Sequence, residues 1–125
     1  MSAAPDRLRA FRYGLAAETA CAWWLRLHGY RIVARRYRTP VGEIDLVARR
    51  GSVLAFVEVK ARADLGELAA PTARQRRRIV RAAQAFLQRN PRLAGLDPRF
   101  DVIAVVPWRR PQHLPGAWRI DDIGG

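Results

Sequence analysis

Acidic residues alternate with apolar ones in two neighbouring stretches of the sequence. Glu43 and Asp45 share one face of an expected strand, and Glu58 and Lys60 share one face of the next, because successive side chains of a strand point to opposite sides. Carboxylate oxygens are the ligands that Mg²⁺ prefers, and a metal so held can activate water beside a phosphate. The pattern predicts a site where three acids and one amine meet around a divalent cation.

A hairpin is the simplest connection between these two strands. With Arg50 and Gly51 as a two-residue turn, Glu43 is expected opposite Glu58, and Asp45 is expected diagonal to it. Like charges directly opposite each other destabilise a sheet by up to about 1 kcal/mol, so a compensating cation is needed. The alternative is an amphipathic hairpin with one face in solvent, which antiparallel sheets commonly have.

Lys60 is the single lysine among 23 basic residues, against 11 acidic ones, and the net charge is +12. Such a balance favours a polyanionic partner, with DNA as the first candidate and RNA also open. The alternative is a basic surface that only keeps the chain soluble. A lysine can orient or deprotonate a water molecule, whereas arginine holds its proton too tightly, which would explain one lysine in an arginine-rich chain.

The composition, 50% hydrophobic and 27% charged residues over 125 positions, predicts a single folded α/β domain over residues 1–125. The expected order is helix, three strands, helix, two strands, with a mixed central sheet flanked by helices. Expected helices cover 5–28 and 72–89, expected strands cover 30–38, 42–49, 53–61, 100–106 and 117–123, and a loop covers 62–70. Asp101 is expected as a satisfied polar group within an apolar, central strand, near the site.

Apolar runs stay below the roughly 18 residues that cross a bilayer, and the start of the chain lacks a signal-like stretch, so a cytoplasmic protein with no membrane partner is expected. The single cysteine, Cys21, excludes an internal disulfide and is expected to be an inert apolar residue. With two histidines in the chain, a metal would rest on carboxylates rather than on a Cys/His set.

Glu18 interrupts the apolar stripe of the expected first helix. The apolar positions of that stripe are Leu8, Phe11, Leu15, Ala22 and Leu25. A carboxylate that faces a core is costly unless it is paired or coordinates a cation. Glu18 is therefore expected either to be a further acid of the site or, with the helix rotated, to lie exposed beside Arg9 or Arg26.

Five arginines gather at the start of the expected second helix: Arg74, Arg76, Arg77, Arg78 and Arg81. A helix N-terminus favours anions, so these residues are candidates for holding DNA phosphates, the alternative being a solvated helix face. Thr72 and Gln75 form a capping-box pattern, and Gln75 shares a stripe with Ile79 that could face the metal.

Aromatic residues near the C-terminal end of the chain lie among arginines. Trp108 and Trp118 flank Arg109, Arg110 and Arg119 and could stack on exposed bases, although packing in a core or an interface is the alternative. Trp23, Trp24 and Phe86 are assigned to core or partner contacts.

Four motifs in order, GLAAE (14–18), GEIDLVA (42–48), FVEVK (56–60) and RFDVIAV (99–105), resemble those of the bacterial YraN family. That family is related to archaeal Holliday-junction resolvases within the PD-(D/E)XK, or restriction-endonuclease-like, nuclease superfamily. The resemblance implies a helix acid at Glu18, a central metal ligand at Asp45, a second ligand at Glu58 and a catalytic lysine at Lys60.

The resemblance further implies Mg²⁺, or Mn²⁺, held by Asp45, Glu58 and the backbone carbonyl of Val59, with Glu18 as an additional candidate ligand. Glu43, Gln75 and Asp101 are expected in supporting positions. The implied function is a metal-dependent DNA endonuclease with a preference for branched or structured DNA, and a homodimer is open. The alternatives are a catalytically inactive nucleic-acid-binding module of the same fold and a protein-interaction adaptor.

Overall fold

The computed structural model describes residues 4–62 and 71–120, and in the first helix it describes side chains from Tyr13 onward. Its elements follow the expected order: α1 (Ala4–Leu27), β1 (Arg31–Thr39), β2 (Gly42–Arg50), β3 (Val53–Ala61), α2 (Ala73–Arg89), the short 3-10 helix η2 (Pro91–Leu93), β4 (Asp97–Val105) and β5 (Gln112–Trp118). The α/β fold class is therefore confirmed. Some predictions fall outside the described residues: positions 63–70 of the expected loop, the side chains of Leu8 and Phe11, and the end of the expected last strand.

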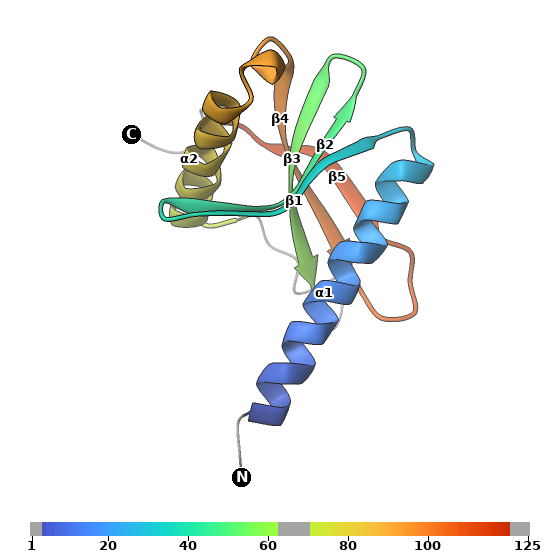
Figure 1. The fold of residues 1–125 in the computed structure, drawn as a ribbon. Coiled ribbons are helices and arrows are strands. Elements are labelled where there is room, and N and C mark those ends of the chain that lie inside the picture. The colour runs from blue at the N-terminus through green and yellow to red at the C-terminus, as the bar shows by residue number, and fades with distance from the viewer. Residues whose placement is uncertain (1–3, 63–70, 121–125) are drawn as a thin grey trace.

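The five strands form one mixed sheet in the order β1-β2-β3-β4-β5. The β3–β4 pair is parallel and the other pairs are antiparallel. A parallel pair needs a crossover connection, and α2 lies within it. Figure 1 shows α1 and α2 on opposite sides of the sheet.

Each helix packs an apolar stripe on its own face of the sheet. Cys21, Ala22 and Leu25 of α1 are buried with Leu46 and Val57, among others. On the other face, a larger cluster contains four residues of α2: Ile79, Ala82, Ala83 and Phe86. The central strand β3 is thus covered on both faces.

Local signals in the sequence determine where α1 ends and where α2 begins. At the end of α1, Gly29 has φ 86°, and the N–H groups of Tyr30 and Gly29 donate to the carbonyls of Leu25 and Arg26, which is a Schellman motif. At the start of α2, Thr72 and Gln75 form the expected capping box.

The register of the β2–β3 hairpin differs from the expectation. Arg50 pairs with Val53, so the two-residue turn is Gly51-Ser52 and not Arg50-Gly51. Gly51 has φ 60°, and glycine with positive φ at the first turn position is the pattern of a type II′ hairpin. The expected direct opposition of Glu43 and Glu58 is therefore wrong.

The last strand also differs from its expected range of 117–123, because β5 spans Gln112–Trp118. The hydrogen-bonded ladder between β5 and β4 has an irregularity between Phe100 and Val102, opposite Pro115 and Gly116. These two residues interrupt the alternation of apolar and polar residues by which a strand is predicted from sequence.

Candidate active site

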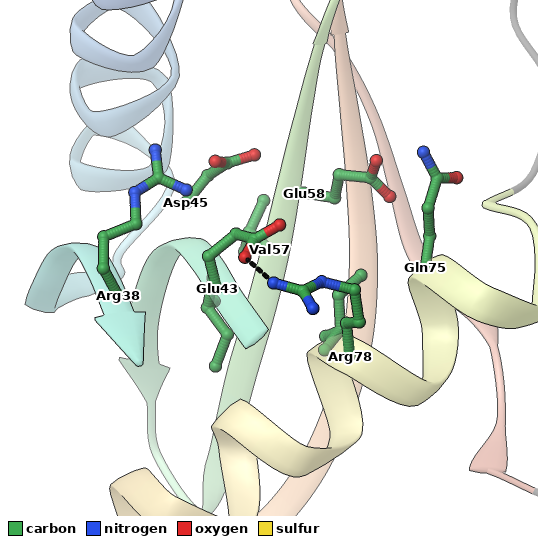
Figure 2. A pocket seen from close by; sticks show the side chains of 9 residues that line it. Arg38, Glu43, Asp45, Val57, Glu58, Gln75 and Arg78 are labelled. Atoms are coloured by element: carbon green, nitrogen blue, oxygen red, sulfur yellow. Dashed lines mark hydrogen bonds and ion pairs between the residues drawn. The ribbon is translucent and has the colours of Figure 1, made fainter. Parts of the chain in front are cut away.

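A pocket of about 200 Å³ lies between β2, β3 and the start of α2. Its lining residues are Arg38, Glu43, Ile44, Asp45, Val57, Glu58, Gln75, Arg78 and Ile79. Figure 2 shows the three acids around the pocket, with Gln75 and Arg78 reaching toward it from α2. Four residues expected at the site from sequence, Glu43, Asp45, Glu58 and Gln75, are thus brought together. Lys60, also expected there, does not line the pocket and lies beside Glu58, which does.

Asp45 is tied to the neighbouring strand by its side chain. The ladder between β2 and β3 runs from Arg50 to Leu46, and beyond it the Asp45 Oδ2 accepts a hydrogen bond from the Val59 N–H at 2.8 Å. Burial raises the pKa of Asp45, and the Val59 hydrogen bond and the charge of Arg38 oppose that rise. This carboxyl group is therefore held in place at an electrostatic cost.

Glu58 and Lys60 occupy alternate positions of β3. Lys60 is only 5% exposed, and its Nζ lies 3.8 Å from Glu58 Oε1. The other carboxylate oxygen, Glu58 Oε2, is buried and has no hydrogen-bond partner among the described residues. Burial raises the pKa of Glu58, Lys60 lowers it, and Asp45 raises it further.

Glu18 of α1 is buried with 7% exposure, so the alternative in which the helix turns it outward is wrong. Its Oε2 lies 3.9 Å from Arg36 Nε, and its Oε1 is buried without a hydrogen-bond partner in the part of the chain that the structure describes. Burial and the charge of Asp45 raise the pKa of Glu18. Glu18 does not line the pocket, but it lies close enough to Asp45 for the two charges to interact.

Two arginines of β1 that sequence reasoning missed face these acids. Arg38 lines the pocket, and the charges of Arg36 and Arg38 lower the pKa values of both Glu18 and Asp45. Arg36 has φ 51°, a left-handed conformation that non-glycine residues rarely adopt. Since β1 is rich in arginine throughout, nothing in the sequence distinguishes these two.

Glu43 is compensated by a cation from α2. Arg78 Nη2 lies 2.9 Å from Glu43 Oε2, a contact that is drawn as a dashed line in Figure 2. Gly42, the residue before Glu43, has no room for a side chain, because an added Cβ would overlap the Arg78 carbonyl. The close approach of β2 and α2 therefore depends on this glycine.

The carboxylates of the pocket offer a divalent metal only part of its ligand shell. Among the side chains described, those of residues 13–62 and 71–120, no three His, Cys, Asp or Glu are grouped closely enough to hold an ion by themselves. Mg²⁺, however, commonly uses one or two carboxylates and completes its shell with water and substrate oxygens. Asp45 and Glu58 fit that requirement, because both carboxylates line one pocket and Glu58 Oε2 is buried without a partner among the described residues.

Asp101 lies in a different network and does not line the pocket. Its carboxylate accepts hydrogen bonds from Arg99, from the Gly116 N–H at 2.9 Å and from His113 Nε2 at 2.8 Å. Burial alone would raise the pKa of Asp101, but the hydrogen bonds from His113 and Arg99 lower it. Asp101 is satisfied, as expected, and fastens β5 to β4 at the irregularity in their ladder.

The arginines of α2 point in different directions. Arg74, Arg77 and Arg81 are exposed, and 100° per residue places them within one arc of the helix. Arg78 pairs with Glu43, whereas the Arg76 guanidinium lies 5.9 Å from the centre of the buried Trp118 ring.

Cys21 is fully buried, and burial raises the pKa of its thiol to about 12. A thiol in this state is a poor nucleophile.

Comparison with known proteins gives the family. The family model of the uncharacterised protein family UPF0102 matches residues 17–105, so this chain belongs to that family. This confirms the resemblance to the YraN family that the motifs indicated.

Relatives within the family align over nearly the whole chain. A UPF0102 protein of Rhodopseudomonas palustris (strain BisB18) is 56% identical, over 94% of this chain and 87% of its own. Those of Parvibaculum lavamentivorans and Paramagnetospirillum magneticum are 58% and 52% identical and cover 90% and 96% of this chain, and 85% and 98% of their own.

Among solved structures, the chain is similar to Hjc of Archaeoglobus fulgidus, a Holliday junction resolvase from an archaeal hyperthermophile. The TM-score is 0.54 at 18% identity, with 83% of this chain and 78% of Hjc covered. This likeness confirms the nuclease-type fold. Within the described part of the chain, no helix is long and apolar enough to cross a membrane.

Proposed function

We propose that this protein is a divalent-metal-dependent endonuclease that hydrolyses phosphodiester bonds in DNA. The observation that carries the proposal is the pairing of Asp45 with the backbone of Val59, which places one acid beside Glu58 and Lys60 of the next strand. The similarity in fold to a Holliday junction resolvase supports DNA as the substrate class and branched DNA as its preferred form.

Asp45, Glu58 and the Val59 carbonyl would hold the metal, with Mg²⁺ first and Mn²⁺ as a substitute. When bound, such an ion lowers the pKa of water and offsets negative charge on a phosphate. The raised pKa values of the two acids indicate that their negative charges are poorly compensated by the protein itself. Glu18 adds negative charge behind Asp45, which strengthens the attraction for a cation.

Lys60 is the group assigned to the reacting phosphate. Its ammonium is nearly buried, lies beside Glu58 and is directed by the same strand that carries that acid. In this position Lys60 orients the attacking water and places positive charge near the phosphoryl oxygens, where negative charge increases during in-line attack. Gln75 and Arg78 at the pocket are assigned to holding the adjoining phosphate groups.

The test compares cleavage of labelled single-stranded, duplex, flap and four-way-junction DNA with Mg²⁺, Mn²⁺ or EDTA. Wild type is expected to cut only when Mg²⁺ or Mn²⁺ is present. Asp45→Asn and Lys60→Ala are expected to lose cleavage while still binding DNA. Asp97→Asn is the matched control, because Asp97 is an exposed acid outside the pocket. Equal cutting by wild type and Lys60→Ala would exclude this mechanism.

Two further outcomes separate the alternatives. Lys60→Arg keeps the positive charge but cannot release a proton, so retained cleavage would assign Lys60 a purely electrostatic role. Tight DNA binding without cutting under any metal would contradict the nuclease proposal and identify a nucleic-acid-binding module.

A further inference from the structure

The turn between β4 and β5 carries a tryptophan in an unfavourable backbone conformation. The Arg109 N–H donates to the Val106 carbonyl, which closes a four-residue turn with Pro107 at its second position. Trp108 at the third position has φ 64°. Proline followed by a residue with positive φ is the pattern of a type II turn, where the third position strongly favours glycine.

Packing does not compensate for this strain. The relative exposure of Trp108 is 102%, so its ring lies outside the protein surface, whereas Trp118 is 3% exposed. The two tryptophans that the sequence left ambiguous are thus distinguished: Trp118 belongs to the core, and Trp108 does not. A bulky residue at positive φ without packing contacts is a marker of function rather than stability.

The turn lies at the same end of the sheet as Asp45, Glu58 and Lys60. β3 and β4 are parallel, with Lys60 paired to Ala104 and Ala61 to Val105, so the turn leaves the sheet just beyond Lys60. The Arg62 N–H also donates to the Val105 carbonyl at 3.0 Å. Figure 1 shows this connection at the end where the β3 arrowhead points.

The residues beside Trp108 supply the charge that a nucleic-acid contact requires. Arg109 and Arg110 follow it directly, and both are exposed. An exposed ring next to cations fits a base that is not paired, because a paired base in a duplex is already stacked on both faces. A negatively charged protein surface would fit the arginines but gives no reason for a strained aromatic residue at the apex.

We propose that Trp108 stacks on an unpaired base of DNA bound at the active site, with Arg109 and Arg110 contacting the neighbouring phosphates. The inference rests on the proposed DNA function and specifies the substrate as DNA with an opened or branched region near the scissile bond.

The test measures binding to a fork with unpaired arms and to a fully paired duplex of equal length, in EDTA so that nothing is cut. Trp108→Ala is expected to weaken fork binding about tenfold and duplex binding less than about twofold, and Trp108→Phe should retain fork binding. Trp23→Ala is the matched control, because Trp23 is 58% exposed on α1 and also has an arginine, Arg26, over its ring. Trp108→Gly should bind the fork as poorly as Trp108→Ala yet melt at a higher temperature.

Unchanged fork binding by Trp108→Ala would overturn the inference, and so would an equal loss on fork and duplex. A protein that binds forks through Trp108 but cuts no DNA would contradict the nuclease proposal alone. A protein that cuts DNA normally and shows no effect of Trp108→Ala on binding would contradict this inference alone. No affinity of the wild type for either DNA would contradict both.

Discussion

The Asp45 carboxylate on β2 accepts a hydrogen bond from the Val59 backbone N–H on β3 at 2.8 Å. This contact replaces the backbone ladder, which ends at the Leu46–Val57 pair. Because Val59 lies between Glu58 and Lys60, a single hydrogen bond fixes the distance between the acid of one strand and the acid and amine of the next. The site thus depends on a side chain that substitutes for a strand pairing.

Asp45→Asn should stabilise the metal-free protein at neutral pH. The pKa of Asp45 is raised from 3.8, so the folded state binds its proton more tightly, and stability falls as pH rises through the folded pKa. Asparagine removes this cost and still offers an oxygen to Val59. We expect the melting temperature to rise by about 4 °C, or roughly 1 kcal/mol, and the gain to vanish below about pH 4. Asp45→Ala lacks the acceptor and should not share the gain; a lower melting temperature for Asp45→Asn would contradict this account.

Mg²⁺ should raise the melting temperature of wild type. A ligand at a hundredfold its Kd stabilises the folded state by about 2.7 kcal/mol. Glu58→Gln should abolish most of the shift, because Glu58 Oε2 is a buried oxygen that no described residue pairs with. The measurement is thermal unfolding at matched ionic strength, with NaCl as the control for screening. The same shift in Glu58→Gln would place the cation elsewhere.

Gly42→Ala should destabilise the protein. The new Cβ would meet the Arg78 carbonyl, so β2 and α2 would have to separate. We expect a loss of about 1–3 kcal/mol in the free energy of unfolding, measured by urea denaturation. Gly14→Ala in α1 is the matched control, since it meets no atom and should gain up to about 1 kcal/mol from helix propensity. A neutral Gly42→Ala would mean that the two elements are not in close contact.

The arginines of α2 should differ in their effect on DNA binding. Arg77→Ala combined with Arg81→Ala should lower the slope of log Kd against log salt concentration by about two. Each phosphate contact contributes roughly 0.9 to that slope. Arg76→Ala should leave that slope unchanged, because its guanidinium lies over Trp118. Titrations at several salt concentrations decide between these outcomes. An equal effect of all three would restore the simpler view of a uniformly basic helix.

Asp101→Asn should destabilise the protein by about 1–3 kcal/mol, because Arg99, His113 and the Gly116 N–H would lose their ionised acceptor. The pKa of Asp101 is lowered from 3.8, so its contribution is present above that value and is lost as pH falls through the folded pKa. Urea midpoints should therefore differ greatly between wild type and variant at about pH 7 and less at about pH 3. A difference that does not depend on pH would contradict an ionised Asp101.

Much of this architecture follows from local sequence signals. The capping box at Thr72, the stop at Gly29 and the alternation around Asp45 and Glu58 predicted helices, strands and the shared face of the acids. The hairpin register could not be settled in this way, because Arg50-Gly51 and Gly51-Ser52 are both acceptable two-residue turns. Only the pairing of Arg50 with Val53 in the folded hairpin distinguishes them.

The charges around the site were less predictable than its acids. Arg36, which lies near Glu18, has φ 51° although it belongs to a strand. No pattern of residue types predicts a left-handed residue within a strand. Arg78 was expected on a phosphate-binding face, but its pairing with Glu43 depends on how closely Gly42 lets α2 approach. Such contacts arise from tertiary packing, which periodicity does not encode.

The two outer strands of the sheet, β1 and β5, leave backbone groups available to other chains. Three exposed arginines, Arg31, Arg35 and Arg38, lie along β1 and repel a second copy of the same edge. On β5, Pro115 lacks an N–H donor and Gly116 turns the backbone to φ 61°. The sheet therefore resists growth by strand addition, and a concentrated solution of this protein should remain free of amyloid-like aggregates.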